Sequence, residues 1–129
     1  MKTAELSTTA EAVLAEVKEV YFDCWNNLPW ATMEKRRRLN FLASHSVTRD
    51  EAVEIMAQAV PNGYNEFQPN GQTLAKFPDD SQITLAREGS VCVYVQGKLP
   101  ANKKYQNDEH TYYPPIPGTP RGETRLWWD

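Results

Sequence analysis

Apolar residues recur every three or four positions through the first sixty residues, which is the period of an amphipathic α-helix. The first run begins at Thr8 and Glu11, which are spaced as in a capping box. In this motif the Thr side chain accepts a hydrogen bond from a free backbone amide of the first turn, and the Glu side chain accepts one from the Thr amide. Thr48 and Glu51 repeat this box before the last run. The predicted helices cover residues 9–27, 33–44 and 49–60.

Beyond the third predicted helix the apolar period changes from near 3.6 to 2, which indicates strands. The predicted strands are Gln72–Phe77, Gln82–Arg87 and Val91–Gln96. Pro-Asn-Gly occurs at residues 61–63 and again at 69–71, and both copies predict turns. We therefore expect an α+β fold in which three N-terminal helices pack on a three-stranded antiparallel meander. Its exposed face is expected to carry Thr84, Cys92, Tyr94 and Gln96.

The period disappears in the last part of the chain. Residues 98–129 hold five of the nine prolines and five of the 14 aromatic residues. Runs of proline favour extended, polyproline-like backbone. The chain is thus predicted to be one domain of 129 residues, with residues 1–7 frayed, residues 8–97 forming the helical and sheet core, and residues 98–129 forming an extended segment on the outside.

Composition narrows the function classes. The formal charge is −3, from 14 basic and 17 acidic residues, which does not support a strongly basic nucleic-acid binder. No apolar run approaches the roughly 18 residues of a membrane span, so we expect a cytoplasmic protein without a membrane partner. Cys24 and Cys92 form no C-x-x-C pair, and two reduced thiols are favoured over a disulfide between them.

Enzyme motifs are nearly absent. The sequence has no phosphate-binding loop, no G-x-S-x-G and no H-E-x-x-H, so no catalytic residue, cofactor or metal is predicted. If the protein were an enzyme of another type, its candidate polar groups would be His45, Asp50 and His110.

A basic run in the second predicted helix offers one functional hypothesis. Cations near a helix N-terminus oppose the macrodipole, and a local rule broken in this way is a place to look for function. The candidate contacts to an anion or nucleic acid are Lys35, Arg36, Arg37, Arg38 and Arg49. The order of three helices and a hairpin suggests a winged helix-turn-helix. Against that alternative, the helix over residues 49–60 also carries Asp50, Glu51 and Glu54.

The C-terminal aromatic residues offer the other hypothesis. Aromatic side chains with arginine have the composition of interface hot spots. The candidate partner-binding residues are Tyr105, Tyr112, Tyr113, Arg121, Arg125, Trp127 and Trp128. The alternative is that they complete the fold by covering a face or edge of the sheet. We expect a small non-catalytic intracellular binding protein, such as an adaptor, an inhibitor or an immunity-type factor, whose partner is another protein or a second copy of itself.

Overall fold

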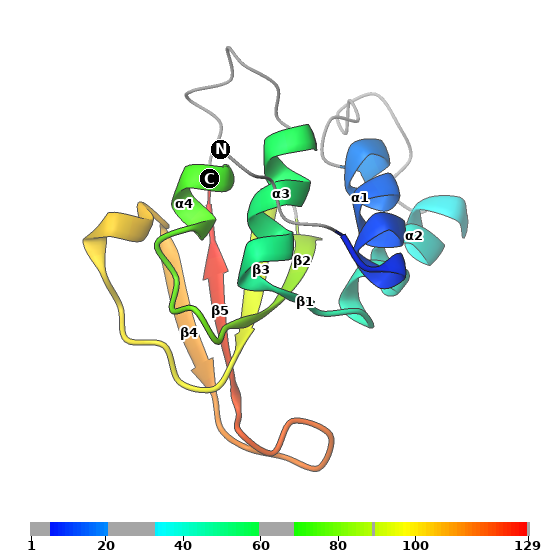
Figure 1. Ribbon diagram of the computed structural model, residues 1–129. Helices are drawn as coiled ribbons and strands as arrows, with labels where there is room; N and C mark the ends of the chain where they lie inside the picture. The colour runs from blue at the N-terminus through cyan, green and yellow to red at the C-terminus, as the bar shows by residue number, and fades with distance from the viewer. Residues whose placement is uncertain (1–5, 21–32, 60–68, 89, 129) are drawn as a thin grey trace.

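A computed structural model describes residues 6–20, 33–59, 69–88 and 90–128 of the chain. The fold mixes helices with one antiparallel sheet, as expected for the α+β class (Figure 1). Its helical segments are α1 (Thr8–Val20), α2 (Met33–Ala43), α3 (Arg49–Ala59), α4 (Gly71–Leu74) and the 3-10 turn η2 (Lys103–Tyr105). Its strands are β1 (Val47–Thr48), β2 (Gln82–Glu88), β3 (Ser90–Gln96), β4 (Glu109–Tyr113) and β5 (Glu123–Trp127).

The five strands are ordered β1-β2-β3-β5-β4, and every neighbouring pair is antiparallel. The last strand of the chain, β5, therefore lies inside the sheet, between β3 and β4. Its residue Leu126 is opposite Val93 on one side and His110 on the other.

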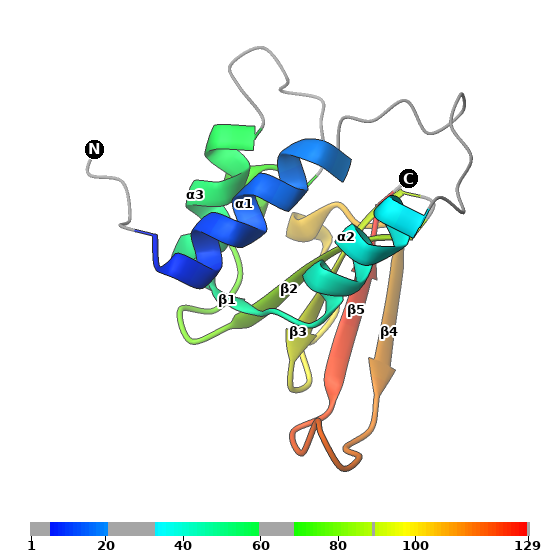
Figure 2. The same cartoon turned by 90° about the vertical axis from the view of Figure 1, so that its right-hand side faces the viewer.

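The described helices pack over one face of the sheet (Figures 1 and 2). α3 contacts β1 and β2, α2 contacts β2, and α1 packs against both α3 and α2. The largest fully buried side chains of the core between helices and sheet are Trp128, Phe77, Leu42, Ile55, Met56, Leu74, Ile83, Leu85 and Leu126. Among the described residues, none of the helices combines the length and the apolar character that crossing a membrane requires.

The predicted three-stranded meander is wrong in its first strand, because Gly71–Leu74 is a helix. Asn70 caps this helix: its side-chain oxygen accepts a hydrogen bond from the Thr73 amide at 3.0 Å. Leu74 and Phe77, which are three positions apart, are both buried. The Pro-Asn-Gly triplet at residues 69–71 was predicted to be a turn, and it instead begins α4.

The prediction that residues 98–129 lie outside the core is also wrong. The segment supplies β4 and β5, and β5 alternates between buried and half-buried side chains as a strand with one covered face does. Thr124, Leu126 and Trp128 are at most 1% exposed. The core is therefore closed by the last residues of the chain, and the sheet has two strands more than predicted.

Three of the helical segments, α1, α2 and α3, overlap the helices that the apolar period predicted, within the described residues, whereas α4 and η2 were not predicted. Residues 21–27 of the first predicted helix, and the turn at residues 61–63, lie outside the described part of the chain. Ser7 caps α1, one position before the predicted Thr8, because its hydroxyl accepts from the Ala10 amide at 3.1 Å. Ser7, predicted to be frayed, is thus held in place.

The second capping box is confirmed. The Glu51 amide donates to the Thr48 hydroxyl at 3.1 Å, and the Glu51 carboxylate accepts from the Thr48 amide at 3.1 Å. The other oxygen of the same carboxylate accepts from the Ser7 amide at 3.1 Å. Burial by itself would raise the pKa of Glu51, but the hydrogen bonds from Ser7 and Thr48 outweigh it and lower the pKa. One carboxylate therefore joins the beginnings of α1 and α3.

Replacing Glu51 with glutamine keeps one acceptor oxygen but removes the charge and the second acceptor, so it should lower the free energy of unfolding by about 1 kcal/mol at neutral pH. Because the pKa of Glu51 is lowered in the folded state, this stabilisation is present above the unfolded pKa of about 4.3 and is lost as the pH falls through the folded value. Urea unfolding should show a smaller difference in free energy of unfolding between the wild type and the variant at pH 3 than at pH 7. Glu54→Gln, on the same helix, is the control, and an equal effect of both variants would contradict the prediction.

Candidate functional site

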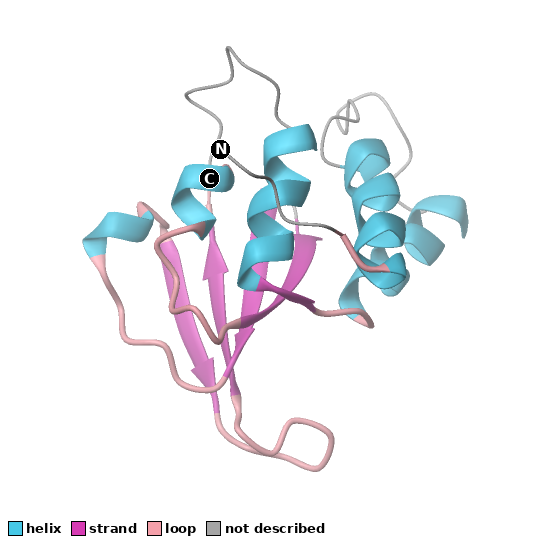
Figure 3. Ribbon diagram, viewed as in Figure 1, coloured by secondary structure: helices cyan, strands magenta, loops and turns pink. Residues whose placement is uncertain are grey.

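The last residue of β4 and the segment that follows it form a proline-rich hairpin, residues 113–121, which we call the proline arm. It extends past the ends of the other strands (Figure 3). At its tip the Thr119 amide donates to the Ile116 carbonyl at 3.0 Å, and the Ile116 amide donates back at 3.3 Å. Pro117 fixes φ at the first central position, and Gly118 takes a φ of 98° at the second. The tip is thus a closed turn.

A second turn forms the base of the arm. The Gly122 amide donates to the Thr119 carbonyl at 2.9 Å, and the Gly122 carbonyl accepts from the Gly97 amide at 2.9 Å. This last bond ties the arm to the end of β3. Four prolines restrict φ before and within these two turns, so the arm has few alternative conformations.

The arm carries exposed apolar surface. Among the described residues, the large hydrophobic side chains that are exposed are Tyr113, at 45%, and Ile116, at 61%. The prolines of the arm are exposed as well. Tyr113 was a predicted partner-binding residue, whereas Ile116 was missed. The Pro117-Gly118 pair, a turn signal, could have identified Ile116 as a tip residue.

Two of the predicted partner-binding aromatic residues belong to the core instead. Tyr105 is 3% exposed and Trp128 is 1% exposed. The Trp128 indole donates to the Tyr105 carbonyl at 2.9 Å, and the Tyr105 ring meets Phe77 edge to face at 4.6 Å between centroids. These residues complete the fold, as the alternative interpretation of the C-terminal aromatic residues anticipated, and they offer no surface to a partner.

The other predicted residues divide between the arm and the two faces of the sheet. Arg121 lies on the arm and is exposed. Tyr112 is half-buried, with the Lys98 ammonium 5.5 Å from its ring centroid. Trp127 is half-buried, and its indole donates to the Glu88 carbonyl at 2.9 Å.

Arg125 lies on the sheet face opposite the helices, between two carboxylates. Its guanidinium donates to Glu88 at 2.8 Å and to Glu109 at 2.9 Å, and Glu88 also accepts from the Tyr94 hydroxyl. Burial by itself would raise the pKa of Glu88, but the hydrogen bonds from Tyr94 and Arg125 hold it below its usual value. The charge of Arg125 is therefore satisfied within the sheet.

Cys92 lies under this cluster as a fully buried free thiol. Burial, and then the nearby charge of Glu88, raise the pKa of Cys92 to about 12. A thiol that stays protonated at neutral pH is a poor nucleophile and a poor metal ligand. Cys24 lies outside the described residues.

The basic residues of the nucleic-acid hypothesis do not act together. Arg36 and Arg37 are exposed on α2, whereas Arg38 pairs with Glu16 at 3.0 Å. The Lys35 side chain lies outside the described part. Arg49 pairs with Asp50 at 2.9 Å and with Asp79 at 2.8 Å, and it also donates to two carbonyls after α4. Arg49 therefore fastens α3 to the segment between α4 and β2.

The candidate groups of an enzyme are held in separate structural contacts. His45 stacks on Phe41, with 4.0 Å between ring centroids, and its Nδ1 lies 2.7 Å from the Phe41 carbonyl. Asp50 pairs with Arg49. The Nε2 of His110 lies 2.7 Å from the Leu99 carbonyl.

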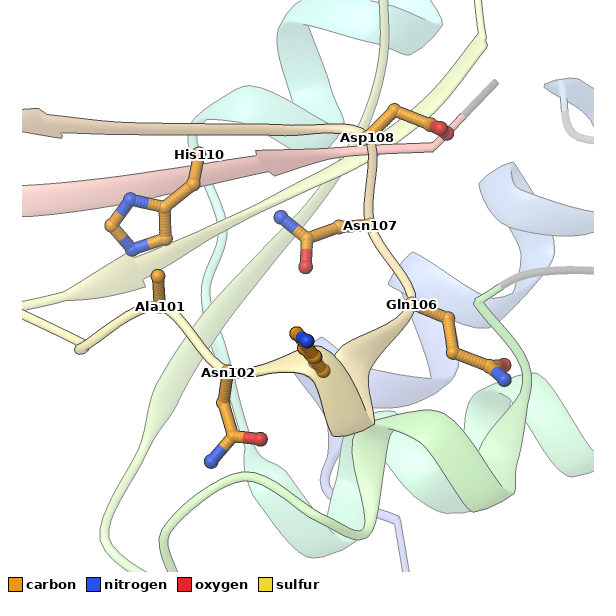
Figure 4. Close-up of a pocket in the computed structure, with 7 residues that line it drawn as sticks. Ala101, Asn102, Gln106, Asn107, Asp108 and His110 are labelled. Atoms are coloured by element: carbon orange, nitrogen blue, oxygen red, sulfur yellow. The ribbon is translucent and has the colours of Figure 1, made fainter.

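His110 also borders a hollow of about 310 Å³ beside the beginning of β4. Its lining residues are Ala101, Asn102, Lys103, Gln106, Asn107, Asp108 and His110. Asn107 points into the space between β4 and the segment of Ala101 and Asn102, whereas Gln106 points away (Figure 4). Two of the side-chain amides in this lining are bonded to nearby backbone groups: Asn102 accepts from the Lys104 backbone amide, and Asn107 donates to the Glu109 backbone carbonyl.

The described residues contain no group of three or more His, Cys, Asp or Glu side chains that could hold a metal ion. No protein-family model, no curated protein and no solved structure matches this chain. The proline arm is therefore assigned as the candidate site on its geometry and exposure alone.

Proposed function

We propose that the protein is a non-catalytic binding protein, acting as an adaptor, an inhibitor or an immunity-type factor, that docks the proline arm onto another protein. The observation that carries the proposal is the exposure of Tyr113 and Ile116 on this one hairpin. Exposed apolar side chains that gather in one place favour a contact with another macromolecule. The expected counterpart is a concave apolar surface that receives Ile116 and the flanking prolines.

The stiffness of the arm supports this proposal. Binding requires loops to be ordered, and each ordered side chain or loop segment reduces the affinity. In the proline arm this ordering is already present, because two hydrogen-bonded turns and four prolines restrict the backbone. Arg121 adds a cation at the base of the arm, and arginine is enriched at protein interfaces.

The winged-helix alternative receives less support. Arg38 and Arg49, two of its five basic residues, pair with acidic groups of the protein itself. The positions that α3 exposes are Asp50, Ala57 and Gln58, which bring a negative charge but no cation to the surface of the proposed recognition helix.

Affinity capture from the native host, with quantitative mass spectrometry, tests the proposal. The double variant Tyr113→Ser, Ile116→Ser should weaken capture of the protein partner tenfold or more, because hot-spot side chains each contribute about 2 kcal/mol or more. Its matched control is Arg36→Ser, Arg37→Ser, which changes two exposed residues on α2. Undiminished capture by the arm variant would contradict the proposal, and loss in the α2 variant alone would transfer the contact to the basic helix.

A further inference from the structure

β4 forms one edge of the sheet (Figure 1). An edge strand presents a row of backbone N–H and C=O groups that a further strand can pair with. Which groups face outward follows from the hydrogen-bond alternation of antiparallel strands: successive residues direct their backbone groups to opposite sides.

The contacts of β5 fix this alternation. The Gly97 amide donates to Gly122 at 2.9 Å, and the Trp128 amide donates to Val91 at 3.1 Å. The even-numbered residues of β5 therefore direct their backbone groups toward β3, and the odd-numbered residues direct theirs toward β4.

The register of β4 with β5 then shows which residues of β4 bond to β5 and which direct their backbone groups outward. Thr111 is opposite Arg125, and Glu109 and Tyr113 are opposite the other odd-numbered residues, so these three bond to β5. The backbone N–H and C=O of His110 and Tyr112 then point away from the sheet. In the described part of the chain, no strand pairs with that side of β4, and no backbone hydrogen bond to His110 or Tyr112 is formed from it.

The protection that usually blocks such an edge is weak here. Lysine and proline within an edge strand discourage pairing. β4 contains neither, and Pro114 follows only after the strand has ended. The charge of Glu109 is compensated by Arg125 at 2.9 Å, and the His110 ring is held against Leu99.

We propose that two copies of the protein pair antiparallel through β4, about a two-fold axis at Thr111, to form one continuous sheet. In this register His110 of each copy is opposite Tyr112 of the other, so the four free donors and four free acceptors of the two strands pair with one another. Glu109 is opposite Tyr113 of the second copy, and Thr111 is opposite Thr111. No like charges meet, as a self-pairing surface requires.

The contact is small. Five residues a side without helix packing fall in the range of weak interfaces, so association in the micromolar range or weaker is expected. The pairing uses the edge of β4, which ends at Tyr113, and leaves the tip at Ile116 unoccupied. It therefore goes beyond the proposed function, and each proposal can fail without the other.

Sedimentation equilibrium of the full chain, from low micromolar to about 1 mM, tests the pairing. The average mass should rise from 14.8 kDa toward twice that value. Thr111→Glu and Thr111→Lys should each stay at the single-chain mass, because two like charges would then meet on the axis. An equimolar mixture of the two variants should recover association, since each axis would join opposite charges.

Gln72→Glu and Gln72→Lys, at an exposed position of α4, bring the same charges away from the edge and should associate as the wild type does. Thermal melts followed by circular dichroism establish that all variants fold. A wild-type chain that stays at 14.8 kDa overturns the proposal. So does association that survives both Thr111 variants, and so does a mixture that fails to associate, because the axis would then not lie at Thr111.

Discussion

Replacing Trp128 with alanine is expected to lower the free energy of unfolding by about 3–5 kcal/mol, the range for truncation of a fully buried tryptophan. The side chain is 1% exposed, and its indole N–H donates to the Tyr105 carbonyl at 2.9 Å. The change leaves a cavity and an unbonded carbonyl in the same place. Since the total free energy of unfolding of a domain is about 5–15 kcal/mol, the variant should be only marginally stable.

Urea unfolding measured by far-ultraviolet circular dichroism compares the wild type with the variant. The dependence of the free energy of unfolding on urea concentration, m, must be equal for the two proteins. The neighbouring tryptophan supplies a matched control. Trp127 is half-buried on the opposite face of the sheet, so Trp127→Ala should cost about 1 kcal/mol. If Trp128→Ala lowered the free energy of unfolding as little as Trp127→Ala, Trp128 would not be part of the core. Residues 98–129 would then lie outside the core, as expected from composition.

This pair of residues also shows where sequence reasoning stopped. Aromatic residues near a chain end have the same composition whether they pack inside or contact a partner. What separates Trp128 from Trp127 is the pairing of β5 with β3, which joins segments about thirty positions apart. That pairing leaves no periodic trace in residues 98–129, which five prolines interrupt. The strands β2 and β3, by contrast, alternate clearly and are joined by a short turn, so their boundaries could be predicted.

The misassigned strand at Gln72–Phe77 has a local cause. The segment is too short for its period to distinguish a single helical turn from a strand. The deciding signal is the Asn70 cap, since an Asn side chain caps the beginning of a helix as readily as it forms a turn.

The candidate site was predicted only in part. Tyr113 and Arg121 were named for their residue types, and both lie on the proline arm. Ile116 was missed although Pro117-Gly118 marks a turn beside it, because its exposure depends on the hairpin that β4 and β5 form together.

Gly122→Ala is expected to lower the free energy of unfolding by about 2–4 kcal/mol, through strain at the base of the arm. Gly122 has a φ of 76°, which L-residues avoid. A Cβ there would lie 2.7 Å from the Tyr112 hydroxyl oxygen and 2.8 Å from the Tyr113 carbonyl oxygen. The second of these is backbone, so relief requires the strand itself to move, and with it the hydrogen bond from Gly97.

Gly118→Ala, at the tip, separates this effect from backbone strain alone. Gly118 has a φ of 98°, but a Cβ there meets nothing within 4 Å. It should therefore cost only about 1 kcal/mol, the conformational penalty of an L-residue with positive φ. Thermal unfolding of the two variants decides between the causes. Equal losses would mean that Gly122 is needed only for its φ, whereas a greater loss at Gly122 would show that β4 packs too closely against the base of the arm to admit a Cβ.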